Sequence, residues 1–85
     1  MGKYRILIKP SAVREIESIP RKDRLRIVRK IQALSQNPRP PGCDKLSAEE
    51  KYRVRQGWYR IAYSEDDQNQ TVLVVKMGHR REVYR

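Results

Sequence analysis

The sequence predicts one small α+β domain, in which two helices pack on a mainly antiparallel four-stranded sheet. Apolar residues alternate with basic ones near the N-terminus and again in the middle of the chain, a period typical of half-buried strands. Between these stretches the apolar residues recur at helical spacing, and a β-branched apolar run follows near the end. The predicted order is strand, helix, helix, strand, strand, strand. Since 85 residues bury enough surface for one core, residues 1–85 are expected to form a single domain.

The first half of the chain contains the first strand and both helices. Residues 3–9 alternate apolar and mostly basic side chains, and Pro10 then changes the period. Residues 12–19 have the spacing of a short amphipathic helix that Pro20 ends, and residues 21–35 have the spacing of a longer one. We expect both apolar stripes to lie in the core. They contain Ala12, Val13, Ile16, Ile19, Leu25, Ile27, Val28, Ile31 and Leu34.

The second half of the chain is predicted to supply the rest of the sheet. The proline-rich residues 37–42 cannot continue a helix and form a stiff connector, which a loop over 43–50 follows. Residues 52–63 have the pattern of a hairpin, and the polar residues 64–70 that of a turn. Residues 71–77 are nearly all apolar and β-branched, which favours an interior strand covered by the helices.

The hairpin carries a distinctive charge pattern. Gln56-Gly57 suits its tight turn because glycine accepts a positive φ, and Arg53, Arg55 and Arg60 would then share one face. An arginine-rich strand is often only a solvated outer face. No acidic residue lies between residues 51 and 64, however, so like charges side by side would favour an anionic ligand.

The composition supports an anionic partner. The chain has 20 Lys and Arg against 10 Asp and Glu, for a net charge of +10, which points to nucleic acid or an acidic protein. Cys43 is the only cysteine, so neither an internal disulfide nor a zinc–cysteine cluster is expected. The apolar runs are too short for a signal peptide or a membrane span, which makes the cytoplasm the expected location and a membrane an unexpected partner.

The last eight residues complete the predicted site. Gly78 permits a sharp exit from the sheet, which would leave His79, Arg80 and Tyr84 near its polar surface. If this segment makes a helical turn, Arg80 and Tyr84 share a side. The alternative is a frayed basic tail, although Val83 and Tyr84 have the character of anchors.

Several short segments, in this order, resemble the RelE branch of the bacterial RelE/ParE toxin superfamily over nearly the whole chain. The segments are Asn37-Pro38-Arg39-Pro40, Lys45-Leu46, Tyr52-Arg53-Val54-Arg55, Gly57-Trp58-Tyr59-Arg60-Ile61 with Tyr63, and Gly78-His79-Arg80-Arg81-Glu82-Val83-Tyr84. The resemblance implies a RelE-like fold and a toxin that acts as a ribosome-dependent endoribonuclease, cutting mRNA in the ribosomal A site. It also implies an acidic, RelB-like antitoxin as partner, beside the ribosome and mRNA.

By position, the resemblance assigns the catalytic roles to Arg53, Arg55, Arg60, Arg80 and Tyr84. The best-studied members have lysines in place of the first two, and a guanidinium, unlike a lysine, stays protonated at working pH. We therefore expect Arg53, Arg55 and Arg60 to clamp the scissile phosphate and stabilise the transition state. Arg80 is expected to contact the same phosphate or assist the departing 5′-oxygen, and Tyr84 to stack on a base or orient the 2′-hydroxyl.

The remaining site predictions concern proton transfer and RNA binding. His79 is a second candidate for proton transfer because its unperturbed pKa lies near neutrality, although a structural role is the commoner one for such a residue. Lys45, Lys51 and Arg81 are predicted to contact RNA or the ribosome. RNA supplies its own nucleophile, so no metal and no cofactor is expected.

Two other functions remain open at this point. One is a ParE-like inhibitor of DNA gyrase, which shares the fold and poisons an enzyme by binding it. The other is a basic RNA-binding module without catalysis. Arrest of replication rather than translation would indicate the first, and intact message after incubation with ribosomes would indicate the second.

Overall fold

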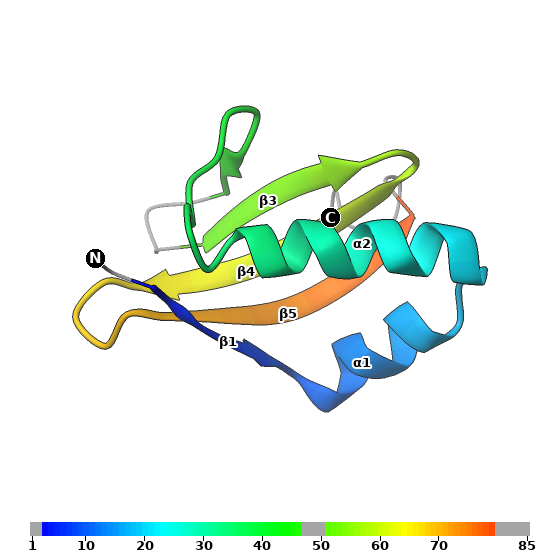
Figure 1. Ribbon diagram of the computed structural model, residues 1–85, viewed down its shortest axis with the longest axis horizontal. Helices are drawn as coiled ribbons and strands as arrows, with labels where there is room; N and C mark the ends of the chain where they lie inside the picture. The colour runs from blue at the N-terminus through cyan, green and yellow to red at the C-terminus, as the bar shows by residue number, and fades with distance from the viewer. Residues whose placement is uncertain (1–2, 47–50, 80–85) are drawn as a thin grey trace.

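The computed structural model describes residues 3–46 and 51–79, and both helices lie on the same side of one sheet (Figure 1). The elements are β1 (Arg5–Ile8), α1 (Pro10–Glu17), α2 (Arg21–Ala33), β2 (Asp44–Lys45), β3 (Lys51–Gln56), β4 (Tyr59–Asp66) and β5 (Thr71–His79). The α+β class and the order of helices and long strands are as predicted.

The sheet has five strands, in the order β1-β5-β4-β3-β2. β1 pairs parallel with β5, and the other pairs are antiparallel. The two helices carry the chain from β1 to the far edge of the sheet, and it returns through β2, β3 and β4 to β5. The predicted four strands omitted β2, which has only two residues and lies in the segment expected to be a loop. β5 lies between β1 and β4, which confirms the interior position expected for residues 71–77.

Two prolines set the helix boundaries. Pro10 occupies the first turn of α1, where its missing N–H costs no hydrogen bond. Pro20 is the N-cap of α2, and its carbonyl accepts the first helical hydrogen bond from Arg24 N at 2.9 Å. Pro20 therefore separates the helices, as predicted.

The core lies between the helices and the sheet. Ile27, Ile31 and Leu34 of α2 are buried, together with alternate residues of β3, β4 and β5. An irregularity in the pairing of β4 with β5, between Ala62 and Tyr63, lets both Val74 and Met77 enter this core. Residues three apart on a regular strand would face opposite sides, so this irregularity is what turns Met77 inward.

Not every apolar residue of the helical stripes is buried. Val13 is 36% exposed and Leu25 is 48% exposed, so the prediction that these two belong to the core was wrong. Both helices are amphipathic, and Val13 and Leu25 lie on parts of their apolar stripes that the core does not bury. The helices therefore keep an apolar outer surface. Within residues 3–46 and 51–79, no helix is long and apolar enough to cross a membrane.

Candidate nucleic-acid interface

The β3–β4 hairpin ends in a two-residue turn. Gln56 pairs with Tyr59, so the turn residues are Gly57 and Trp58 rather than the predicted Gln56 and Gly57. Gly57 has a φ of +61°, which the first position of a type II′ turn requires and which a side chain would strain. The exposed Trp58 therefore stands at the tip of the hairpin.

Arg53, Arg55 and Arg60 form what we call the arginine face. Arg55 pairs directly with Arg60 across the hairpin, and Arg53 precedes Arg55 by two residues on the same strand. The alternation of a strand therefore places all three on one side, while Tyr52, Val54 and Ile61 face the helices. The predicted shared face is observed.

The members of the arginine face differ in their surroundings. Arg60 is only 6% exposed, and the Arg53 side chain only 12%, whereas Arg55 is exposed. Asp44 of β2 pairs with Arg53 in register and accepts a hydrogen bond from its Nη2 at 3.3 Å. The expectation that no carboxylate neutralises the three arginines thus fails at Arg53, because Asp44 arrives from outside the hairpin.

The sheet extends further than predicted at its C-terminal strand. β5 runs through Gly78 to His79, so Gly78 lies opposite Arg60 inside the sheet and does not provide the expected sharp exit. His79 pairs with Tyr59 on the next rung, which places both on the side opposite the arginine face. The His79 ring stacks on Trp58 with centroids 6.3 Å apart and meets Tyr59 edge-on at 6.2 Å.

The other predicted site residues are spread more widely. Lys51 pairs with Ser64 on the side of the arginine face, and Lys45 pairs with Tyr52. Both lysines are exposed. Arg80, Arg81 and Tyr84 lie outside the described residues, so their positions relative to the arginine face stay a prediction.

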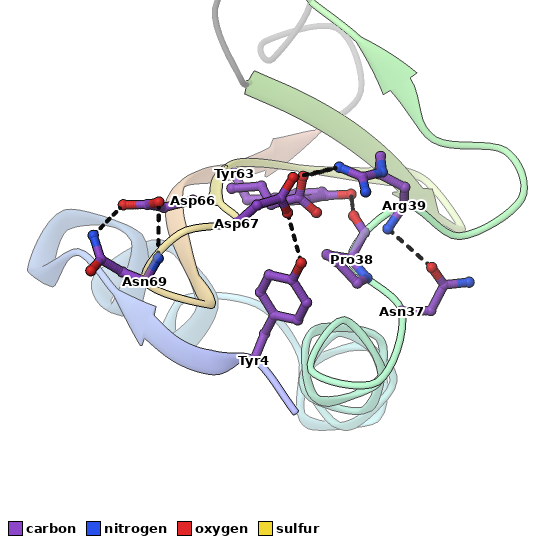
Figure 2. Close-up of polar contacts among 9 residues, drawn as sticks. Tyr4, Asn37, Pro38, Arg39, Tyr63, Asp66, Asp67 and Asn69 are labelled. Carbon is purple, nitrogen blue, oxygen red and sulfur yellow. Dashed lines mark hydrogen bonds and ion pairs between the residues drawn. The ribbon is translucent and has the colours of Figure 1, made fainter. Parts of the chain in front are cut away.

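A second polar group, which we call the Arg39 cluster, lies at the opposite end of the hairpin (Figure 2). Arg39 forms an ion pair with Glu65 through its Nη1, and the same nitrogen lies 3.7 Å from Asp67. Tyr4 donates a hydrogen bond to Asp67 at 2.6 Å. Glu65 and Asp66 belong to β4 and not to the turn predicted over 64–70. The cluster ties β1 and the proline-rich connector to the end of β4.

Tyr63 anchors the same connector from within the core. Its hydroxyl donates to the Pro38 carbonyl at 2.5 Å, and burial raises the pKa of the phenol far above its usual value. The pKa of Arg39 is also raised, first by a hydrogen bond with Tyr52 and then by the Glu65 carboxylate. These groups keep their ordinary charges near neutral pH, so the cluster is a fixed structural joint.

Comparison with known proteins places this fold in a family. Residues 6–84 match the family model described as the ParE toxin of the type II toxin-antitoxin system parDE. The chain belongs to the ParE/RelE family of type II toxins. No curated protein sequence gives a match.

Solved structures similar to this ParE/RelE toxin come mainly from RelE proteins. The Mycobacterium tuberculosis toxin-antitoxin complex RelBE2 contains a chain that is 25% identical, with a TM-score of 0.80, over 91% of this chain and 98% of that one. The archaeal RelE-RelB complex of Pyrococcus horikoshii gives 24% identity and a TM-score of 0.81, over 92% and 96%. The isolated Escherichia coli RelE toxin gives 22% and 0.80, over 95% and 90%. The last two support the fold alone.

The sequence did not single out Trp58 or Asp44 of this toxin as functional residues. Trp58 has the period of a strand residue, and only the placement of the turn shows it at the hairpin tip. Asp44 lies in the predicted loop, nine residues before its ion-pair partner. In the part of the chain that the structure describes, no group of three His, Cys, Asp or Glu could hold a metal ion.

Proposed function

We propose that this toxin is a ribosome-dependent endoribonuclease that cleaves mRNA in the A site. The observation that carries the proposal is the arginine face, where Arg55 and Arg60 meet directly on a side of the sheet that neither described helix covers. Opposed like charges destabilise a sheet, and a bound phosphate removes that cost. A guanidinium pair of this kind matches a phosphodiester and its transition state.

The proposed reaction uses the nucleophile of RNA itself. The 2′-oxygen attacks the adjacent phosphorus and loses its proton, the P–O5′ bond breaks, and the departing 5′-oxygen gains a proton. The products are a 2′,3′-cyclic phosphate and a 5′-hydroxyl. Alignment contributes up to roughly 7–11 kcal/mol in ideal cases, and the ribosome is proposed to supply part of it.

Each arginine has a proposed role that follows from its surroundings. Arg55 is the accessible phosphate ligand, and the buried Arg60 is a fixed charge on the neighbouring strand. Arg53, held by Asp44, flanks the pair. Arg80 and Tyr84, which the resemblance assigns to the site by position, have the roles proposed from the sequence: Arg80 contacts the same phosphate or assists the departing 5′-oxygen, and Tyr84 stacks on a base or orients the 2′-hydroxyl. His79 is the second candidate for proton transfer, although its register places it across the sheet from Arg60.

Cleavage of message with and without ribosomes tests the proposal. Purified toxin should cut mRNA on programmed ribosomes and leave naked RNA largely intact, and a single 2′-deoxy substitution at the cleaved position should abolish the cut. Equal cutting of naked RNA would contradict the dependence on ribosomes. Arg80→Ala should slow cleavage far more than it weakens ribosome binding.

A ParE-like action on DNA gyrase is the second candidate, because the matching family model carries the ParE description. The two functions separate in cells. A nuclease of mRNA stops translation first, whereas a gyrase inhibitor stops replication and induces the DNA-damage response. Purified toxin that blocks gyrase supercoiling and spares message on ribosomes would select this second function.

An acidic antitoxin is the proposed partner. Its apolar residues would cover the exposed Val13 and Leu25 of the helices, and its charge would meet a toxin of +10. Since apolar contacts would carry most of the affinity, the complex should survive moderate salt, which only slows its formation. Dissociation of the complex by moderate salt alone would contradict this arrangement.

A further inference from the structure

The tip of the β3–β4 hairpin presents a large aromatic surface to solvent. Trp58 is 66% exposed, more than any other large hydrophobic residue in the described part of the chain. It is also the only tryptophan of the protein. Neither the core nor the proposed phosphate chemistry uses it. An indole held at this exposure on a rigid turn is a feature that binding sites use.

The Trp58 ring is held in place by its neighbours. His79 lies against it with an interplanar angle of 9°, and Tyr59 meets His79 at 71°. Tyr59 packs against the core, so the stack is connected to the interior of the domain. Because one face of the indole already packs on His79, the side chain has less freedom to lose on binding.

The basic residues of the same hairpin favour a nucleic acid as the occupant. Arg55 and Arg60 form the second rung of the hairpin from its tip, so roughly 7 Å of strand separates their backbone from Trp58. The Trp58 ring stacks on His79, across the sheet from the arginine face, so a strand that passes over the hairpin tip would reach both. An aromatic ring together with fixed guanidinium groups is the combination that binds single-stranded nucleic acid, the ring taking a base and the charges the backbone. An acidic peptide would use the charges, but it would have no planar group for the ring.

We propose that Trp58, backed by His79, is a stacking platform for one base of single-stranded RNA whose phosphate lies on the arginine face. This deepens the proposed function and rests on it, since it names what the hairpin tip binds next to the cleaved linkage. The strand would pass over the end of the sheet, with a base on the tip and its backbone continuing toward Arg55. Stacking is tolerant of sequence, so the platform would add affinity with little base preference.

Fluorescence of the single tryptophan tests this directly. The probe is a 2′-O-methyl hexa-adenylate, which lacks the nucleophilic hydroxyl and cannot be cut, and the comparison is an abasic backbone of the same length and charge. We expect the hexa-adenylate to quench Trp58 emission saturably and the abasic strand to quench it little. Equal quenching by both strands would show that only phosphates bind and would overturn the proposal.

Substitution gives the second measurement, by anisotropy of a dye-labelled hexa-adenylate. Trp58→Ala should weaken binding roughly 5- to 150-fold, the range for loss of one stacked base, and Trp58→Phe should recover part of it. Leu7→Ala removes a 47% exposed apolar side chain from β1 and should change nothing. An RNA affinity of Trp58→Ala within twofold of wild type would overturn the proposal. If this variant then failed to bind the antitoxin, the hairpin tip would be a binding site for the protein partner.

The two proposals fail separately. The hexa-adenylate binds without ribosomes and without cleavage, so quenching can persist in a protein that leaves message intact. Such a result would contradict the proposed nuclease activity and support the proposed stacking platform. The opposite result is that Trp58→Ala cleaves message on ribosomes at the wild-type rate and that RNA does not quench the wild-type fluorescence. It would contradict the stacking platform and support the nuclease activity.

Discussion

The charged side chains are arranged differently at the two ends of the β3–β4 hairpin. At the end where β4 finishes, every charge of the Arg39 cluster has a counter-charge close by, and Tyr63 and Tyr4 add hydrogen bonds (Figure 2). At the tip, Arg55 and Arg60 oppose each other directly. The Arg39 cluster stabilises the fold, whereas two like charges set opposite each other at the tip favour the binding of an anion.

The largest expected effect comes from removing one charge of the arginine face. Arg60→Gln keeps a polar side chain that can donate hydrogen bonds but removes a fixed charge, and it should lower the single-turnover rate of mRNA cleavage on programmed ribosomes about 100- to 1,000-fold. Arg5→Gln is the matched control, because Arg5 is an exposed arginine of β1, far from the hairpin tip. If both variants kept the wild-type rate while folded by circular dichroism, the arginine face would not be the catalytic surface.

The next largest effect comes from removing the cation of the Arg39 cluster. Arg39→Ala leaves the Glu65 side chain, which is 0% exposed, without this cation. Removing one partner of a buried pair costs about 3–5 kcal/mol, and the 47% exposure of the Arg39 side chain lowers this to about 2 kcal/mol. Urea unfolding measures the loss, and Glu65→Gln in the same chain should restore part of it. The cleavage rate below the melting temperature should stay near that of wild type.

Tyr63→Phe should have a smaller effect that depends on pH. Loss of the hydrogen bond to Pro38 should destabilise the fold by about 1–2 kcal/mol at neutral pH. Because burial raises the folded pKa of Tyr63 above 10, its stabilising contribution is complete below pH 10 and is lost as the pH rises further. The unfolding free energy of Tyr63→Phe should therefore fall less steeply above pH 10. Tyr4→Phe, at an exposed site, should cost less at neutral pH.

The smallest effect concerns the β4–β5 turn. The Asn69 amide donates to Asp66 at 2.7 Å and lowers the pKa of that carboxyl, so this contact stabilises the turn above the ordinary carboxyl pKa and is lost as the pH falls. Asn69→Ala should raise the Asp66 pKa toward its usual value in an NMR titration. Gln68→Ala keeps its backbone N–H and should leave the titration unchanged. The cleavage rate should not respond to either variant.

The sequence was sufficient for the features that periodicity encodes. Alternation placed Arg53, Arg55 and Arg60 on one face, and the two prolines marked where α1 and α2 begin. Both follow from local rules: side chains alternate along a strand with a period of two residues, and proline lacks a backbone N–H. The prediction of fold class rested on these features and was confirmed.

What the sequence could not provide depends on contacts between distant segments. Asp44 neutralises Arg53 only because β2 pairs with β3, and two residues are too few to show a period. Glu65 had the composition of a turn residue, yet Arg39, 26 residues away in the chain, lets it be buried within β4. Trp58 became recognisable as a surface feature only when the turn was placed one residue further along.

Glu15 of α1 protects part of the edge of β5 that no strand of the described residues covers. Its carboxylate accepts a hydrogen bond from the Met77 backbone N–H at 2.9 Å and from Lys76 Nζ at 3.2 Å, beyond the point where β1 stops pairing with β5. The side chain thus satisfies a donor that a neighbouring strand would otherwise satisfy. An unprotected edge of this kind invites pairing with a second molecule. Glu15 therefore removes the Met77 N–H from the donors with which a strand of another molecule could pair.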